Sequence, residues 1–105
     1  MRAAEIMPRA VIRDLQNIGR AIAIARRRRR IPISMMLERT GLSKRTYSQV
    51  EKGVPTVSMA AYAMALNALG LASNLALLAD PAKDEAGLLI EAQNLPQRIR
   101  QRKVP

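Results

Sequence analysis

Apolar residues recur at helical spacing in the first third of the chain. The positions concerned lie four, three, four and three residues apart: Val11, Leu15, Ile18, Ile22 and Ala25. This spacing places them on one face of an α-helix. Pro8 is suited to the first position of a helix, and Pro32 disfavours helical geometry at the residue before it. The pattern therefore predicts one long helix over residues 9–29.

Shorter helices are predicted after Pro32, because glycine, serine, Pro81 and Asp84 mark their ends. Glycine is typical of helix C-termini and serine of N-caps. The predicted helices cover residues 33–39, 44–52, 59–69, 74–79 and 85–93. We expect an N-terminal arm (1–8), a main domain (9–71), C-terminal helices for dimerisation or partner docking (72–95) and a basic tail (96–105).

The composition favours an all-α fold. Apolar residues make up 49% of the 105 residues, but aromatic residues only 2%, so the core must be aliphatic. Ala, Leu and Met are good helix formers, and hairpin dipeptides are missing. We expect a compact all-α bundle of five to six helices with a long basic first helix. Four methionines are expected in its core rather than on a binding surface: Met35, Met36, Met59 and Met64.

Positive charge is concentrated in the first half of the chain, whose net charge is +10. Residues 1–53 carry 13 Lys and Arg against 4 Asp and Glu, residues 54–97 have a net charge of −3, and residues 98–105 carry four basic residues. Such asymmetry is typical of a surface that binds a polyanion. The alternative is that the charge serves only solubility.

The residue types present give little support for an enzyme, a metal-binding protein or a membrane protein. The chain has no cysteine and no histidine, the residues that most often bind metals or act in catalysis. The acidic residues are scattered, so we expect no catalytic site, no metal site and no cofactor. No apolar run approaches the ~20 residues of a membrane span, and the N-terminus lacks the apolar stretch of a signal peptide. We therefore expect a cytoplasmic protein that is not an enzyme and does not contact a membrane.

The segment GLSKRTYSQVEKG, residues 41–53, carries the strongest functional signal. A helix, a glycine turn and a Ser43-capped helix form the spacing of a helix-turn-helix motif. Thr46, Tyr47 and Val50 share one face and are expected to pack on the preceding helix. The polar residues then point outward near the start of the second helix: Lys44, Arg45, Ser48 and Gln49. In such motifs these positions meet base edges, where Arg and Lys can bind guanine and Gln can bind adenine.

The same residues resemble a known family. LSKRTYSQVEKG is similar to the recognition-helix signature of Xre/Cro-type helix-turn-helix repressors, IGRAIAIAR to their first helix and VSMAAYAMALNALGL to their fourth. The resemblance covers about residues 18–71. Residues 78–100, LADPAKDEAGLLIEAQNLPQRIR, further resemble HipB-like antitoxins, whose genes lie beside kinase-fold HipA-like toxins. The resemblance implies a Cro-like bundle and a sequence-specific DNA-binding repressor.

The resemblance also implies roles for individual residues and partners. Lys44, Arg45 and Gln49 fall on base-reading positions, and Arg26 and Glu51 on an ion pair that joins the first and third helices. Phosphate contacts are expected from the hydroxyls and from the arginine run: Ser43, Thr46, Ser48, Arg27, Arg28, Arg29 and Arg30. The implied partners are double-stranded DNA with a palindromic operator, a second copy in a homodimer, and a kinase-fold toxin whose operon the protein represses.

Three departures from the family pattern and two alternative functions stay open. Leu37 stands where a small residue is expected, which implies a wider helix separation or a different crossing angle. Ile33 stands where the second helix often begins with a polar residue that contacts a phosphate, a role that the arginine run is then expected to take over. Arg30 stands where the first helix often ends in Gly, and a left-handed Arg costs ~1 kcal/mol. One alternative is a stand-alone phage-type or chromosomal repressor without a toxin. The other is a non-specific basic adaptor for nucleic acids.

Overall fold

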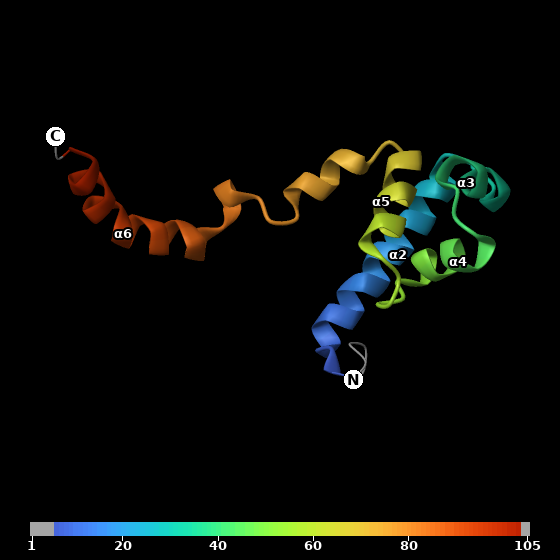
Figure 1. Cartoon of the computed structure of the whole chain (residues 1–105). Helices are drawn as coiled ribbons and strands as arrows, with labels where there is room; N and C mark the ends of the chain where they lie inside the picture. Colours follow the sequence, from blue (N-terminus) through green and yellow to red (C-terminus); the bar gives the residue numbers. More distant parts are fainter. Residues whose placement is uncertain (1–5, 104–105) are drawn as a thin grey trace. The chain divides into compact units, whose positions relative to one another are not determined.

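The computed structural model confirms the all-α class for the part of the chain that it describes, which is the backbone of residues 6–103 and the side chains of residues 6–94 (Figure 1). Most of the expected N-terminal arm and the side chains of the expected basic tail lie outside these limits. The α-helices are α2 (Arg9–Arg28), α3 (Ile33–Thr40), α4 (Lys44–Lys52), α5 (Met59–Ala68) and α6 (Glu85–Lys103). Two 3-10 helices, η1 (Ala72–Leu77) and η2 (Pro81–Lys83), precede α6. Within the described residues, no helix combines the length and apolar character needed to cross a bilayer.

The chain divides into two units, one that ends at Ser73 and one that begins at Asn74. The first unit contains α2 to α5 and the whole buried core. Its buried core side chains come from all four helices, the loop after α2 and the end of α5: Ile22, Ala25, Ile31, Met36, Tyr47, Val50, Ala61, Tyr62, Ala65 and Leu69. Two tyrosines supply the only aromatic rings of the chain, and the Tyr62 hydroxyl donates to the Val54 carbonyl at 2.8 Å.

The end of α2 explains how the chain turns toward α3. Arg30 adopts a left-handed conformation with φ of 52°, as expected at this position. The N–H of Ile31 donates to the Arg26 carbonyl at 3.2 Å, and the N–H of Arg30 donates to the Arg27 carbonyl at 2.9 Å. These two bonds form a Schellman motif, which normally uses glycine at the left-handed position. The arginine therefore strains the backbone, while buried Ile31 anchors the turn in the core.

Helices α2 and α4 approach each other most closely at two glycines. A Cβ atom on Gly19 would lie 2.5–2.7 Å from backbone atoms of Val50, Glu51 and Gly53. A Cβ atom on Gly53 would collide with the backbone of Leu15. Such distances cannot be relieved by turning a side chain, so the contact requires glycine at both positions. Leu37, where the family pattern has a small residue, instead lies partly buried beside the core on α3.

Three expectations for the helices and their packing were wrong. The helix expected over residues 74–79 is the 3-10 helix η1, because six residues are too few to repay the cost of starting an α-helix. Helix α6 continues through Pro96 to Lys103 instead of ending near residue 93. Of the four methionines expected in the core, only Met36 is buried, and Met59 is 71% exposed.

Candidate nucleic-acid interface

Helices α3 and α4 are joined by a short turn that several hydrogen bonds stabilise. Gly41 ends α3 in a left-handed conformation with φ of 72°. The Thr40 hydroxyl donates to the Met36 carbonyl at 2.7 Å and accepts from the N–H of Leu42 at 3.2 Å. Ser43 then caps α4, because its hydroxyl accepts from the N–H of Thr46 at 3.1 Å. These bonds order the turn and cap the start of α4, which packs on α2 and α5.

The side chains of α4 separate into a buried face and a polar face. Tyr47 and Val50 are buried, as the helical spacing predicted. Lys44, Arg45 and Ser48 are exposed. Gln49 is only half-exposed, so it lies at the edge of the polar face rather than at its centre. Two of the three residues expected to read bases thus project freely from the first turn of α4.

Two hydroxyls that were expected to contact phosphates serve the N-cap as well. The Ser43 hydroxyl donates to the Thr46 hydroxyl at 3.0 Å, in addition to accepting from the Thr46 N–H. Thr46 is half-buried and belongs to the boundary between the two faces of α4. Ser48, by contrast, is exposed and lines a groove beside the helix. Of these three hydroxyls, that of Ser48 is the most accessible to a ligand.

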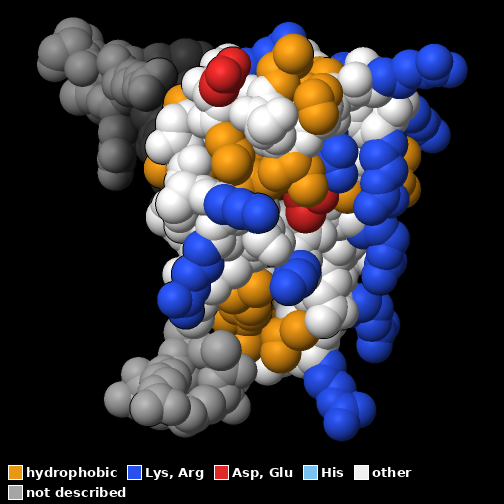
Figure 2. All heavy atoms as spheres, turned by 90° about the vertical axis from the view of Figure 1, so that its right-hand side faces the viewer, with side chains coloured by type: hydrophobic (Ala, Val, Ile, Leu, Met, Phe, Trp, Pro, Cys, Tyr) orange, Lys and Arg blue, Asp and Glu red, His pale blue; other side chains and the backbone are white. Residues whose placement is uncertain are grey.

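An open groove of about 570 Å³ runs between α2 and α4. Ala23, Tyr47 and Ile33, the first residue of α3, contribute apolar surface to it. Its polar lining comes from both helices and is rich in cations: Gln16, Arg20 and Arg27 from α2, and Lys44, Ser48, Glu51 and Lys52 from α4. Basic side chains also outnumber acidic ones on the face drawn in Figure 2, where several follow one edge of the molecule. The groove is therefore suited to an anionic ligand.

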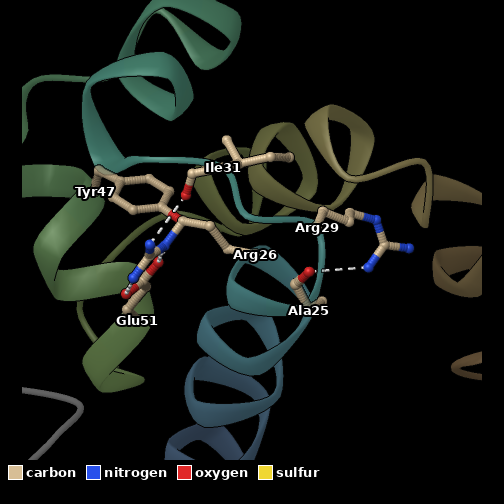
Figure 3. A network of polar contacts seen from close by, with 6 residues as sticks. All are labelled: Ala25, Arg26, Arg29, Ile31, Tyr47 and Glu51. Atoms are coloured by element: carbon tan, nitrogen blue, oxygen red, sulfur yellow. Dashed lines mark hydrogen bonds and ion pairs between the residues drawn. The ribbon is translucent and has the colours of Figure 1, made fainter.

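The negative charge of Glu51, the acid in the groove lining, is compensated by hydrogen bonds from neighbouring side chains (Figure 3). The Arg26 guanidinium donates to the two carboxylate oxygens of Glu51 from Nε at 2.7 Å and from Nη2 at 3.2 Å. Its third bond goes to the Ile31 carbonyl at 3.1 Å. The Tyr47 hydroxyl donates a short hydrogen bond to the same carboxylate. The ion pair implied by the family resemblance is thus present, and it joins α2, the turn after it and α4.

The network shifts the pKa values of its members in consistent directions. Burial alone would raise the pKa of the Glu51 carboxyl, but hydrogen bonds from Arg26 and Tyr47 outweigh burial and lower it. Burial and the bond to Glu51 raise the pKa of the Tyr47 hydroxyl. The bond to Glu51 raises the pKa of Arg26. Glu51 is therefore ionised and Tyr47 neutral near pH 7, so the network contributes no unpaired charge to the groove.

The arginine run after Arg26 divides into residues with different surroundings. Arg27 lines the groove. Arg29 folds back, and its Nη1 donates at 3.0 Å to the Ala25 carbonyl, which also accepts from the N–H of Arg29 at 3.3 Å (Figure 3). Arg28 and Arg30 are exposed. Five consecutive arginines therefore serve at least three purposes: a buried ion pair, a lining of the groove and a helix cap.

Sequence reasoning did not identify Arg20 and Lys52 as part of this surface. Lys52 lies eight residues after Lys44 and four after Ser48, and this spacing would have placed all three on one side of α4. Arg20 lies seven residues before Arg27, which gives the same signal on α2. That these two rows face each other depends on the packing of α2 on α4. Among the described residues, no three His, Cys, Asp or Glu side chains gather in a way that could hold a metal ion.

Comparison of the chain with models of protein families, with curated proteins and with solved structures gave no match.

Proposed function

We propose that this protein is a sequence-specific DNA-binding repressor in which α4 enters the major groove of its operator. The observation that carries the proposal is the form of α4 itself. It is a capped helix that follows a tight turn, and its first turn presents two exposed cations, Lys44 and Arg45. An α-helix fits the major groove of B-DNA, and residues near the start of a recognition helix meet the base edges.

The charge of the first unit supports DNA as the ligand. Residues 6–73 carry twelve Lys and Arg against three Asp and Glu, and one of these acids, Glu51, is paired with Arg26. A strongly basic surface attracts the phosphate backbone and releases its counterions on binding. The cations of the groove would then contact phosphates beside the bases that α4 reads. Phosphate contacts position the protein, whereas Arg45 and Gln49 would distinguish one base pair from another.

The second unit supports the part of the proposal that concerns partners. Five of its large apolar side chains are at least 48% exposed, and Leu75 is partly buried; the five are Leu77, Leu78, Leu88, Leu89 and Ile90. Exposed apolar residues in such number are typical of an interaction surface. We assign this surface to a second copy of the chain, so that the dimer matches a palindromic operator.

The proposal includes the role of an antitoxin that represses its own operon and binds a kinase-fold toxin, which rests on the family resemblance alone. A stand-alone repressor and a non-specific adaptor remain the alternatives. Purifying the protein together with the product of a neighbouring kinase gene would separate the antitoxin from a stand-alone repressor. A lack of sequence preference in DNA selected from a random pool would favour the adaptor.

The experiment that tests DNA reading is a base-by-base specificity profile of variants in α4. DNA is first selected from a random pool with the unaltered protein. Arg45→Ala and Gln49→Ala should each relax the preference at one position of every half-site, by ~1–3 kcal/mol for a bidentate contact. Arg39→Ala serves as the control, because Arg39 is exposed on α3 and does not line the groove. Profiles parallel to that of the unaltered protein, shifted only in affinity, would show that α4 does not read bases.

A further inference from the structure

Four arginines form a row along one side of α2. Arg13, Arg20 and Arg27 follow one another at intervals of seven residues, and Arg9 lies four residues before Arg13. Seven residues are almost two helical turns, so each step rotates the side chain by only about 20°. All four side chains are exposed. We call them the arginine row, which extends over roughly 27 Å at 1.5 Å per residue.

Half of the arginine row faces the groove beside α4. Arg20 and Arg27 line this groove together with Lys44 and Lys52 from the opposite side. The acid in its lining, Glu51, is bound to the buried Arg26. An anionic chain that contacts Lys44 and Lys52 would therefore also reach Arg20 and Arg27. The arginine row and the polar face of α4 belong to one continuous basic surface.

The other half of the row extends past the groove toward the N-terminus of α2. Arg13 lies about 10 Å along the helix axis from Arg20, and Arg9 lies a further 6 Å or so away. Neither residue lines the groove. The single acid of α2, Asp14, projects about a third of a turn away from Arg20 and Arg27. Positive charge thus continues along α2 beyond the part of the surface that α4 occupies.

We propose that the arginine row binds the phosphate backbone of duplex DNA outside the bases that α4 reads, with Arg9 and Arg13 as contacts to the flanking sequence. This inference rests on the proposed function, because it needs α4 to place the duplex. DNA is favoured over an acidic protein because the row is continuous with the groove beside the base-reading helix. The row is as long as about eight base pairs at 3.4 Å per pair. The DNA beside the bases that α4 reads must cover at least part of this length to reach Arg9 and Arg13.

The consequence is a dependence of binding on the length of the duplex. Two duplexes are compared: the selected operator alone, and the same operator extended by about eight base pairs on each side. Each phosphate contact adds about 0.9 to the slope of log affinity against log salt. The unaltered protein should therefore show a steeper slope on the long duplex. Arg9→Gln with Arg13→Gln should lower that slope on the long duplex by up to ~1.8 for each bound protomer, and should affect the short duplex only through the loss of two exposed charges.

Arg39→Gln provides the matched control. It removes one exposed arginine from the same unit, but from α3 and away from the groove. It should weaken binding to both duplexes equally, through net charge alone. Arg9→Gln and Arg13→Gln should leave thermal unfolding and the preferred sequence unchanged, because both side chains are exposed.

The outcomes separate this inference from the proposed function. If the double variant behaves like Arg39→Gln on both duplexes, the row does not contact flanking DNA and the inference is wrong. If it keeps the slope of the unaltered protein but loses binding to polyglutamate, the row serves an acidic protein and the inference is equally wrong. If no sequence preference is found at all, the proposed function fails. Contacts between the arginine row and phosphates would still be supported by one result on duplexes of random sequence. The salt slope would have to increase with duplex length for the unaltered protein but not for the double variant.

Discussion

At the scale of single residues, the pair of Arg26 and Glu51 ties α4 to α2. The guanidinium contacts α4 through Glu51 and the end of α2 through the Ile31 carbonyl. Both charged side chains are largely buried, with 10% and 14% of their surface exposed. Removing one partner of such a pair leaves the other charge buried without compensation, which typically costs 3–5 kcal/mol.

Glu51→Gln should therefore destabilise the protein in a pH-dependent manner. At pH 7 we expect a loss of about 3 kcal/mol in the free energy of unfolding. Because the pKa of Glu51 is lowered by folding, its contribution is complete above the unfolded carboxyl's pKa of ~4.3 and is lost as the pH falls through the lower folded-state pKa. The difference between variant and unaltered protein should thus shrink below pH ~4.

Urea unfolding at several pH values, followed by circular dichroism, measures this difference. Glu38→Gln is a suitable control, because Glu38 is an exposed acid on α3 of the same unit. It should change the free energy of unfolding by no more than ~0.5 kcal/mol. A Glu51→Gln protein as stable as the Glu38→Gln protein at pH 7 would show that the pair contributes little.

At the scale of helices, the contact between α2 and α4 depends on Gly19. Alanine is the better helix former by ~1 kcal/mol, so Gly19→Ala would stabilise an isolated α2. In the folded protein the added Cβ atom would meet the backbone of α4 at 2.5–2.7 Å. Overpacking of this kind costs ~1–3 kcal/mol or more when only backbone can move. We expect a net loss of about 2 kcal/mol in the free energy of unfolding, together with a wider groove.

Gly41→Ala separates this clash from ordinary backbone strain. Gly41 is left-handed, but a Cβ atom there would meet nothing within 4 Å. This variant should lose about 1 kcal/mol through strain alone. Thermal unfolding of both proteins gives the comparison. If Gly19→Ala is as stable as the unaltered protein, or more stable, the close approach of α2 and α4 is refuted.

The helices themselves were largely predictable, whereas their mutual arrangement was not. The ends of α4 follow from Ser43 and Gly53, because an N-cap and a left-handed glycine act locally. The groove, in contrast, depends on how α2 packs on α4, which no local pattern specifies. The exposure of Met59 shows the same limit, because α5 is apolar except for Asn67 and its sequence does not reveal which side faces the core.

At the scale of the whole chain, the two units differ in whether they are expected to fold independently. The first unit contains the complete buried core, so it has the apolar interior that an independent domain needs. In the second unit, none of the described side chains is buried. Helices without tertiary packing are marginally stable in water. This unit is therefore expected to gain stability from a partner, which we take to be a second copy of the chain.

A protein cut after Ser73 should accordingly fold but remain monomeric. Its helical content per residue and its unfolding should resemble those of the first unit in the full chain, because the core is retained. The full chain should sediment as a dimer. A full-length variant with Leu88→Glu and Leu89→Glu tests the same surface without truncation, because it places charges where two exposed leucines lie. It should dissociate to monomers and lose affinity for a two-fold operator, while each half-site is still read with the same preference. Sedimentation of the truncated protein as a dimer would place the interface on the first unit, where Val11 and Ile18 on α2 are among the exposed apolar side chains.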